Sequence, residues 1–378
     1  MKYYIIAGEA SGDLHGSNLI KELKKLDRNA SFRCWGGDLM NEQTNNLAKH
    51  HKDYSYMGFL EVFLNLYRII KNISFCKSDI LKYNPDIIIY IDFPGFNLRI
   101  AEWAKKNGFK NHYYISPQIW AWKESRIKLI KKVVDKMYVI LPFEKKFYKE
   151  KHNFDVSFVG HPLMDEISKR NSEDTSKLSQ KISKDKTILL LPGSRDQEIK
   201  KLLPIMLSVV SEFKDYKFIV GAAPSQKLSV YQNYVKERNV EIIQNKTYGL
   251  LKNCTAAIVT SGTATLETAL FKVPQIVCYK SSWTTYLIGK ILLKNLNYIS
   301  LVNLIANKLI VKELIQNACS KKNLIKELNI ILEKEERAKI ISNYNKLENS
   351  LGGRGASNKT AKIIYNYLVE ENSGTKDS

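Results

Sequence analysis

Residues 86–91 (DIIIYI) form an almost uninterrupted apolar run that leads directly into the turn-forming sequence DFPGFN. A strand that is apolar on both faces belongs inside a parallel sheet, because crossover helices cover such a sheet on both sides. A helical pattern follows near residues 98–106. This segment therefore predicts a strand, a loop and a helix of an α/β fold.

The same pattern recurs along the chain in two sets. The first set also predicts strands at residues 2–6, 112–115, 136–140 and 157–159, with a glycine-rich loop and a helix at 14–26 after the first strand. A polar stretch at residues 171–186 is the best linker candidate. The second set predicts strands at 187–191, 217–220, 240–243, 256–259 and 275–278. Two doubly wound α/β halves are therefore expected.

The length of 378 residues also favours two domains, because single cores usually stop growing below this size. We expect an N-terminal domain at 1–165 and a C-terminal domain at 166–344. Helical spacing continues to residue 368 and is broken by SLGGRGAS at 350–357, and the helix at about 345–368 is expected to return to the first domain. Residues 370–378 should be disordered.

Charge and cysteine content indicate which partners the protein could bind and in which compartment it could work. The 59 Lys and Arg residues against 38 Asp and Glu give a net charge of +21, which suits nucleic acid, anionic lipid or phosphorylated substrates. A general abundance of Lys explains part of this excess equally well. Five scattered cysteines without a C-x-x-C pair suit reduced thiols in the cytoplasm. Neither a signal peptide nor a transmembrane helix is expected, since polar residues interrupt the apolar stretch at 283–305.

Loops after predicted strands should carry the chemistry, since open α/β sheets bind ligands there. The first such loop, AGEASGDLHG, contains Glu9, Ser11, Gly12 and Asp13. Its glycines allow close backbone approach, and the helix behind it offers N–H groups to an anion. A tight turn with Asp13 as a helix cap is an equally good interpretation. In the second loop Asp92 ends a buried strand, where a raised pKa would suit a general base, although such aspartates are more often turn formers.

Two loops of the second half could hold a phosphate. LLPGSR offers the Gly193 and Ser194 amides and the Arg195 guanidinium, which suits bidentate phosphate contact. In TSGTATLETAL a helix begins near Ser261, Gly262 and Thr263 and can hold a diphosphate, with Glu267 further along. An exposed turn and simple helix capping are the alternatives. His161, just before the linker, is a further candidate, although a structural histidine is the commoner outcome.

Ten motifs occur in an order and spacing that resemble the lipid-A-disaccharide synthase family. They span residues 3 to about 318 and read AGEASGD, WGGDLM, MGFLEV, IDFPGFN, YYISPQIWAW, LPFEKKFY, VGHPLMD, LLPGSR, SGTATLE and YISLVNLIA. The resemblance implies the GT-B fold, in which two Rossmann-like doubly wound domains face each other across a cleft. One departure is Val302, where the family commonly has proline.

The resemblance also implies a reaction and residue roles. The donor would be UDP-2,3-diacylglucosamine and the acceptor 2,3-diacylglucosamine 1-phosphate (lipid X), joined with inversion through the acceptor 6-hydroxyl. Asp92 resembles the general base of the family, whereas Arg195, Glu267 and Asn303 resemble residues on the nucleotide side. Glu9, Ser11 and Asp13 match a loop on the acceptor side.

No cofactor and no metal are expected, since no Asp-x-Asp pair stands in a suitable loop. A helix rich in Phe, Leu, Ile and Tyr is predicted at 57–73, with Arg68 and Lys71, and either a lipid-contacting face or a core helix explains it. With the net charge, this favours peripheral binding to the anionic inner face of the inner membrane. A homodimer is among the expected assemblies.

Other functions remain open at this stage. Another UDP-sugar enzyme of the same fold, such as a UDP-N-acetylglucosamine 2-epimerase or the peptidoglycan N-acetylglucosaminyltransferase, would share the nucleotide loops. A nucleic-acid-binding protein would explain the charge, but the sequence has no recognisable motif of that kind and no clustered basic stripe, so no nucleic-acid partner is expected.

Overall fold

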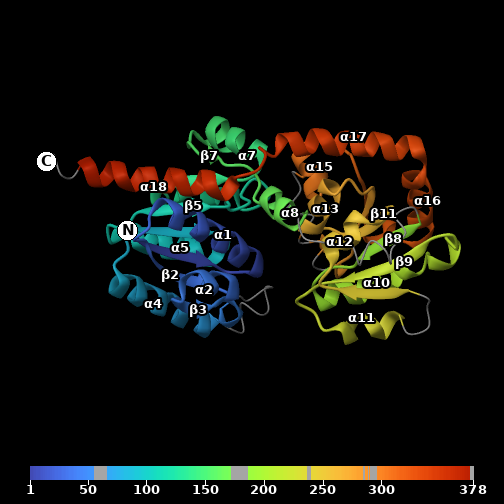
Figure 1. The fold of residues 1–378 in the computed structure, drawn as a ribbon, viewed down its shortest axis with the longest axis horizontal. Coiled ribbons are helices and arrows are strands. Elements are labelled where there is room, and N and C mark those ends of the chain that lie inside the picture. The colour runs from blue at the N-terminus through green and yellow to red at the C-terminus, as the bar shows by residue number, and fades with distance from the viewer. Residues whose placement is uncertain are drawn as a thin grey trace. The chain divides into compact units, whose positions relative to one another are not determined.

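A computed structural model of the chain describes residues 1–54, 66–171, 186–235, 240–283, 286–287, 289 and 296–374. The chain divides into two compact units (Figure 1). The N-terminal unit comprises Met1–Asp165 and Leu351–Ser378, and the C-terminal unit comprises Glu166–Ser350. The predicted linker lies, except for its ends, outside the described residues.

The N-terminal unit contains a seven-stranded sheet in the order β3-β2-β1-β4-β5-β6-β7. All neighbouring strands pair in parallel, for example with Ile5 opposite Ile89 and Tyr90 opposite Tyr113. The strands are β1 (Lys2–Ala7), β2 (Ser31–Gly36), β3 (Leu47–His50), β4 (Ile87–Ile91), β5 (Asn111–Tyr114), β6 (Lys136–Val139) and β7 (Ser157–Phe158).

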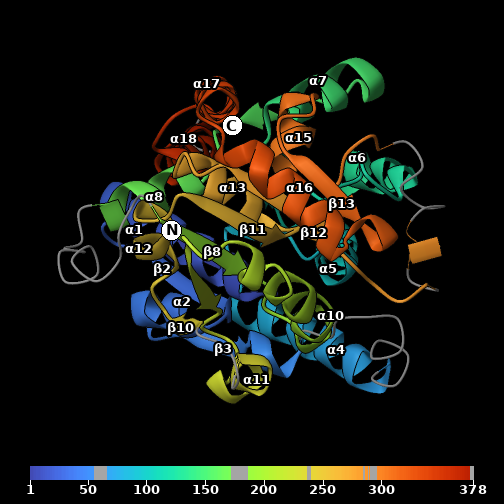
Figure 2. The ribbon, with the colours of Figure 1, turned by 90° about the vertical axis from the view of Figure 1, so that its right-hand side faces the viewer.

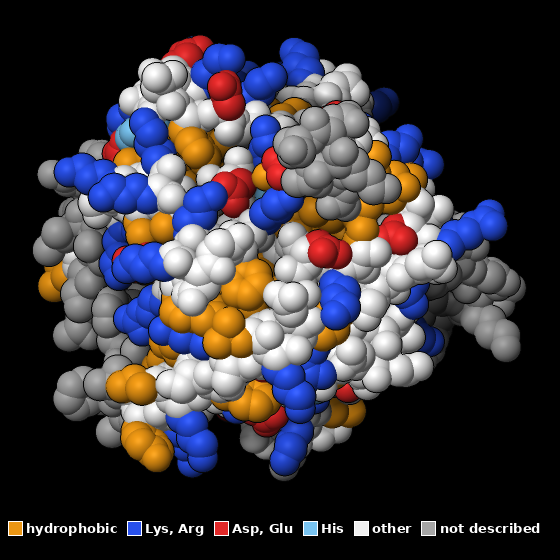
Figure 3. Space-filling model, turned by 90° about the vertical axis from the view of Figure 1, so that its left-hand side faces the viewer, with side chains coloured by type: hydrophobic (Ala, Val, Ile, Leu, Met, Phe, Trp, Pro, Cys, Tyr) orange, Lys and Arg blue, Asp and Glu red, His pale blue; other side chains and the backbone are white. Residues whose placement is uncertain are grey.

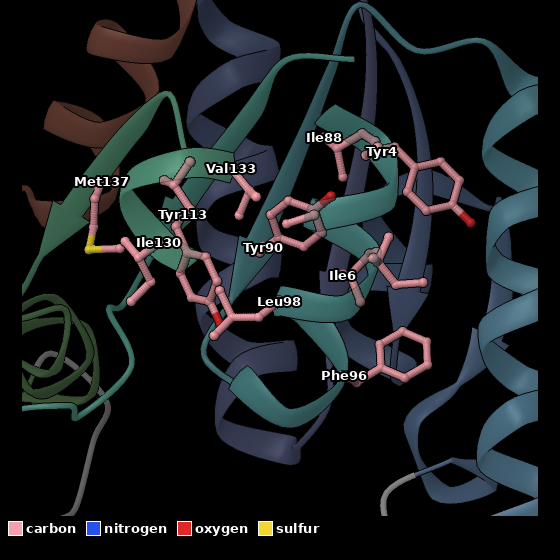
Figure 4. Packing of buried hydrophobic residues seen from close by; sticks show 14 of the residues in the cluster. Tyr4, Ile6, Ile88, Tyr90, Phe96, Leu98, Tyr113, Ile130, Val133 and Met137 are labelled. Atoms are coloured by element: carbon pink, nitrogen blue, oxygen red, sulfur yellow. The ribbon is translucent and has the colours of Figure 1, made fainter. Parts of the chain in front are cut away.

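Successive side chains of β1 and β4 enter two different cores. Tyr4, Ile6 and Tyr90 belong to one buried cluster, whereas Tyr3 and Ile5 belong to the other, as the two-residue period of a strand requires. Figure 4 shows part of the first cluster, where Tyr113 lies near Leu98 and Ile130. The helices of this unit are α1 (Ala10–Leu26), α2 (Asp38–Thr44), α4 (Leu66–Tyr83), α5 (Pro94–Lys106), α6 (Ile127–Val133), α7 (Pro142–Lys146) and α18 (Ala356–Gly374), and α8 (Leu163–Asn171) leads into the next unit.

The last helix returns to the N-terminal unit, where α18 packs against α1 (Figure 1). Asn358 donates a hydrogen bond to Glu22, 2.8 Å long. The expected disorder from residue 370 is wrong for residues 370–374, which continue α18, and Glu371 pairs with Lys110 at 2.8 Å. Residues 375–378 lie outside the described part. The stretch 345–350, expected to return with this helix, instead ends α17 in the C-terminal unit.

The C-terminal unit contains a six-stranded parallel sheet in the order β10-β9-β8-β11-β12-β13, of which β8, β11, β12 and β13 are seen side by side in Figure 2. Its strands are β8 (Thr187–Leu191), β9 (Lys217–Ala222), β10 (Glu241–Gln244), β11 (Ala256–Thr260), β12 (Gln275–Tyr279) and β13 (Lys312–Ile315). Its helices are α10 (Asp196–Leu207), α11 (Leu228–Val235), α12 (Thr247–Lys252), α13 (Thr263–Leu270), α15 (Leu301–Ala306), α16 (Lys321–Leu332) and α17 (Lys334–Ser350).

The expected fold class, two doubly wound α/β units, is confirmed. The part of the predicted helix 57–73 that the structure describes belongs to α4, which extends on to Tyr83, whereas residues 57–65 lie outside the described part. Short 3₁₀ turns occupy His51–Asp53, Glu124–Arg126, Val210–Glu212 and Gln316–Ala318, and Phe147–Lys151 forms a π-helical turn. Within the described residues, every helix is too short or too polar to cross a bilayer.

Candidate active site

The strand order of the N-terminal sheet reverses between β1 and β4. Both strands start from the middle of the sheet, and their connections leave in opposite directions. A crevice at the carboxyl ends of two such strands is the usual ligand site of an open α/β sheet. The loops after β1 and β4 contain Glu9 and Asp92, so the fold brings together two residues that are far apart in the sequence.

The backbone of Asp92 is held in a conformation that few residues adopt. Asp92 and Phe93 both have positive φ angles, of 46° and 49°, which cost energy for residues with a side chain. Asn97 Nδ2 and the Tyr113 hydroxyl both donate hydrogen bonds to the Asp92 carbonyl oxygen, at 2.7 and 2.5 Å. The Asp92 N–H donates to Tyr114 O at 3.2 Å. These bonds fix the position of the carboxyl group at the end of β4.

Burial raises the pKa of the Asp92 carboxyl to about 6, and the negative charge of Glu9 contributes in the same direction. A hydrogen bond from the Phe93 N–H partly offsets both effects. A carboxylate with a pKa just below neutral pH is ionised when a substrate binds and still accepts a proton readily. Asp92 therefore has the position and the basicity of a general base.

The pKa of Asp92 predicts how activity depends on pH. A base must be deprotonated, so kcat/KM should fall as the pH drops through about 6. Replacing Glu9 by Gln removes a neighbouring negative charge, so it should move this acid limb to lower pH. A pH series of initial rates for the parent and Glu9→Gln checks the prediction. An acid limb at the same pH in both proteins would contradict the coupling of the two carboxyl groups.

The glycines of the first loop serve packing within the unit. A Cβ on Gly8 would lie 2.2 Å from the Phe93 ring, and one on Gly16 would lie 2.6 Å from Met40 Sδ. A Cβ on Gly12, which is buried at the start of α1, would lie 3.1 Å from Ala7 Cβ. Ser11 is exposed on the first turn of α1. Only Gly8 therefore meets the Asp92 loop directly, through Phe93.

Asp13 is a structural residue in this fold. Its buried carboxylate accepts hydrogen bonds from the N–H groups of Gly37, Leu39 and Met40, at 2.7, 3.1 and 3.0 Å. These groups begin α2, so Asp13 caps a different helix from the one that contains it. The expectation that Asp13 faces an acceptor is corrected, because its oxygens are occupied by the protein.

His161 is also enclosed by the protein. The side chain is buried, and its Nδ1 accepts a hydrogen bond from the Leu163 N–H at 3.2 Å. Its backbone N–H donates to Leu351 O at 3.0 Å, where the chain re-enters the N-terminal unit. Burial and the neighbouring His15 lower its pKa to about 3, so the imidazole is neutral near pH 7. His161 therefore holds Leu351, the residue at which the chain re-enters the N-terminal unit, and this agrees with the interpretation of His161 as a structural histidine.

The C-terminal sheet has its own switch point, between β8 and β11. The loop after β8 contains Gly193, Ser194 and Arg195, and the loop after β11 contains Ser261 and Gly262 before α13 begins at Thr263. Because β8 and β11 are paired in parallel, their carboxyl ends bring these two loops together. The sheet therefore unites the two predicted phosphate-binding loops.

The loop after β8 depends on a glycine and presents a cation. Gly193 has φ +108°, and a Cβ there would lie 2.4 Å from Glu198 Oε2, so a side chain at this position would strain the backbone and displace Glu198. The Ser194 N–H donates to the same carboxylate at 3.3 Å. The side chain of Arg195 is 65% exposed, and its guanidinium lies 3.8 Å from Glu198, too far for a strong hydrogen bond. An exposed contact of this length contributes little to stability.

The loop after β11 presents the N-terminus of α13. Gly262 and Thr263 are exposed, and the Ser261 N–H donates to Cys278 O at 3.0 Å. The Ser261 hydroxyl donates to Ile299 O at 3.2 Å. Glu267 lies further along α13, where it accepts a hydrogen bond from the Tyr248 hydroxyl at 2.9 Å and remains half-buried. This helix end can bind an anion through its N–H groups and dipole.

Asn303 does not present its side chain to a ligand, which corrects the expected nucleotide contact. It is fully buried, and its Nδ2 donates to Val311 O and Glu313 Oε1, each at 2.8 Å. Its Oδ1 accepts from the N–H groups of Ile310 and Val311, at 2.7 and 3.0 Å. All four bonds of the amide are thus used to join α15 to β13. Glu313 also binds Ile299 N and Ser300, so this network positions the segment that contacts Ser261.

Three side chains that fix loops of the N-terminal unit were not singled out from the sequence. Tyr113 and Asn97 hold the backbone of Asp92, as described above. Glu144 is a buried carboxylate that accepts hydrogen bonds from Ser116 Oγ and Trp120 Nε1, at 2.6 and 3.1 Å, and fixes the loop after β5. The motifs YYISPQIWAW and LPFEKKFY contain Tyr113 and Glu144, so these motifs were the sequence signal that could have identified the two residues.

Among the described residues no group of three or more His, Cys, Asp or Glu side chains could hold a metal ion.

Comparison with known proteins gives matches over the whole length. A family model described as lipid-A-disaccharide synthetase matches residues 3–366. The lipid-A-disaccharide synthase of Syntrophus aciditrophicus is 38% identical over 373 residues, covering 96% of this chain and 97% of the relative. That of Geobacter metallireducens is 36% identical over 372 residues and covers 96% of both.

Solved structures share the fold at low identity. The UDP-GlcNAc 2-epimerase from Neisseria meningitidis bound to UDP-GlcNAc has a TM-score of 0.66 at 14% identity, covering 98% of this chain and all of the other. A putative UDP-N-acetylglucosamine 2-epimerase from Listeria monocytogenes has the same TM-score at 13% identity, covering 98% of this chain and 97% of that one. At this identity the likeness concerns the fold alone, and it agrees with a GT-B-like fold that contains two parallel α/β sheets.

Proposed function

Because the chain belongs to the lipid-A-disaccharide synthase family and is a glycosyltransferase of lipid A biosynthesis, we propose that it joins two acylated glucosamines. In this reaction 2,3-diacylglucosamine passes from UDP-2,3-diacylglucosamine to the 6-hydroxyl of lipid X with inversion. The products are lipid A disaccharide 1-phosphate and UDP. The observation that carries this proposal beyond the family is Asp92, a carboxylate with a raised pKa at the switch point of the N-terminal sheet.

Asp92 acts on the acceptor in this proposal. Its carboxylate takes the proton of the 6-hydroxyl while the oxygen attacks the anomeric carbon of the donor. A new glycosidic bond forms on the face opposite the departing UDP, which gives inversion. The fixed backbone of Asp92 keeps the carboxylate oriented before the substrate binds, so little reorganisation is needed in the transition state. Burial, together with the negative charge of Glu9, keeps the pKa of Asp92 high.

The C-terminal unit receives the leaving group. As the bond between the anomeric carbon and the diphosphate breaks, negative charge gathers on the diphosphate oxygens. The N-terminus of α13 and the exposed Arg195 guanidinium stabilise that charge. In this proposal helix dipole and guanidinium do the work that a divalent cation does in other glycosyltransferases.

A product assay tests the function and its alternatives. The protein is incubated with radiolabelled lipid X and the diacylated UDP-sugar, with and without a chelator, and the lipids are separated by chromatography. We expect a labelled disaccharide in equal yield under both conditions. A yield that collapses with chelator would overturn metal independence, and no disaccharide would overturn the transferase reaction. An epimerase would instead interconvert UDP-sugars without any lipid acceptor.

We also propose that the outward face of α4 binds an anionic membrane surface. Ile73, Cys76 and Ile80 pack into the core, whereas Tyr67 and Ile70 on the opposite side are 78% and 56% exposed. The basic residues Arg68, Lys71 and Lys82 are exposed on the same helix. An apolar stripe flanked by cations is typical of a helix that lies in a lipid headgroup layer.

Figure 3 shows one face of the molecule, on which Lys and Arg are scattered instead of forming the stripe that a nucleic acid would need.

Vesicle binding checks the membrane proposal. Arg68→Gln/Lys71→Gln should weaken binding to vesicles that contain phosphatidylglycerol by about 10- to 30-fold, since each basic residue near an anionic surface adds about 1 kcal/mol. Binding to pure phosphatidylcholine should be weak for both proteins. Lys200→Gln/Lys362→Gln, which removes two exposed charges elsewhere, is the matched control. An equal loss in the control would mean that only net charge matters, and the α4 face would lose its assigned role.

A further inference from the structure

Among the described residues, the half-buried Arg126 forms no ion pair with a carboxylate. Arg126 ends the turn Glu124–Arg126 that leads into α6, and burial together with the neighbouring Arg99 lowers its pKa. In the described part of the chain no carboxylate forms an ion pair with Arg126. Glu124, two residues away, is engaged by Lys151 and His152 at 2.7 and 2.9 Å. A guanidinium that is partly withdrawn from water and has no carboxylate partner in the described part of the chain is suited to bind an external anion.

Two more cations accompany Arg126. The Lys123 Nζ lies 4.6 Å from the centre of the Trp122 ring, and the Arg126 guanidinium carbon lies 5.3 Å from the same ring. Lys123 has φ 54°, a left-handed conformation that is costly for a lysine. It lies between Trp122 and the turn Glu124–Arg126. Arg99 comes from α5, which packs against α6. We call Arg99, Lys123 and Arg126 the cationic cluster.

The cationic cluster is connected to Asp92 through one side chain. The Tyr113 hydroxyl donates its hydrogen bond to the Asp92 carbonyl oxygen, and the same side chain also interacts electrostatically with Arg126. Tyr113 lies near Leu98 of α5 and Ile130 of α6 in Figure 4. These are the two helices that bring Arg99 and Arg126 to this end of the sheet. An anion held by the cluster would therefore lie at the same end of the sheet as the candidate base.

We propose that the cationic cluster binds the phosphate monoester of the acceptor sugar, with Arg126 as its main contact. The inference rests on the proposed function, in which the acceptor has a phosphate on C1 and reacts through the hydroxyl on C6. C1 and C5, which bears the C6 hydroxymethyl group, both flank the ring oxygen, so holding the phosphate at the cluster restricts where the 6-hydroxyl can lie and can direct it toward Asp92. Arginine suits this role because its planar fork binds two phosphate oxygens at once.

Substrate comparison separates a phosphate contact from a structural role. Initial rates are measured with lipid X and with 2,3-diacylglucosamine, which lacks the phosphate, for the parent, Arg126→Gln, Arg126→Lys and Lys132→Gln. Lys132 is exposed on α6 and is the matched control. We expect Arg126→Gln to lose about 10- to 100-fold in kcat/KM for lipid X, as a lost charge-assisted hydrogen bond predicts. The rate with the dephosphorylated acceptor should change less than about threefold, and Arg126→Lys should retain part of the preference.

A binding measurement keeps the test independent of turnover. Calorimetric titration with glucosamine 1-phosphate and with glucosamine should show a preference for the phosphorylated sugar in the parent and not in Arg126→Gln. Equal losses of activity with both acceptors, or binding that does not depend on the phosphate, would overturn the cluster as a phosphate site. If the parent forms no disaccharide yet binds the phosphorylated sugar through Arg126, the site stands and the proposed reaction fails. If it forms disaccharide and Arg126→Gln keeps the full preference for lipid X, the reaction stands and the site fails.

Discussion

Replacement of Asp92 by asparagine is expected to lower kcat by about 10³-fold, because general base catalysis contributes about 10²- to 10⁴-fold. Asparagine keeps the size of the side chain but cannot accept the proton of the 6-hydroxyl. The backbone bonds from Asn97 and Tyr113 reach the carbonyl oxygen of residue 92 and not its side chain, so they survive the change. Initial rates at saturating donor and acceptor, measured between pH 5 and 9, give the effect.

Binding and stability measurements decide how that loss is interpreted. The affinity for UDP should stay close to that of the parent, since the diphosphate is assigned to the C-terminal unit. Removal of a buried, partly charged carboxyl should leave the protein at least as stable, because burial disfavours the charged form of Asp92. Glu102→Gln, an ionisable side chain on α5, serves as the control for a general charge effect. Near-parental activity of Asp92→Asn would remove Asp92 from the role of base.

The central strands were predictable because burial on both faces leaves a clear trace in the sequence. Runs such as IIIYI in β4 and ILLL within β8 consist of hydrophobic residues at every position and are fully buried or nearly so. Three strands were not predicted, namely β2 (SFRCWG), β3 (LAKH) and β13 (KELI). Two of these are edge strands, which bury less surface and therefore tolerate polar residues. β2 contains Arg33, which forms an ion pair with Asp79 of α4. The sequence does not show that these two residues meet, so the charge of Arg33 argued against a buried strand.

The loops of the candidate site could also be predicted from the positions of the buried strands. The hydrogen-bond partners of individual side chains in these loops could not. Any loop after a central strand is a good candidate, which places Asp92, Ser194 and Gly262 correctly at strand ends. Asp13 and Asn303 have the same polar character, yet both saturate backbone groups of other segments. The segments that they bind start 24 residues after Asp13 and seven residues after Asn303. A motif therefore identifies a residue that matters without telling whether it binds ligand or protein.

Replacement of Arg195 by alanine is expected to weaken donor binding by about 10- to 100-fold. A charge-assisted hydrogen bond is worth about 1.5–3 kcal/mol, and a guanidinium in the loop after β8 could make one or two such bonds to a diphosphate held by the N-terminus of α13. The exposed contact with Glu198 at 3.8 Å should contribute little to stability, so the melting temperature should move by no more than about 2 °C. Calorimetric titration with UDP measures the affinity without any lipid substrate.

Two further variants make the Arg195 result specific. Arg195→Lys keeps the charge but loses the planar fork, so its affinity for UDP should lie between those of the parent and Arg195→Ala. Lys200→Ala removes an exposed cation from the same helix, α10, and should bind UDP as the parent does. The loss in Arg195→Ala should also shrink as the salt concentration rises, because screening weakens the exposed guanidinium in the parent. An unchanged dissociation constant in Arg195→Ala would mean that the diphosphate does not reach the loop after β8, and the leaving-group site would have to be assigned to other residues.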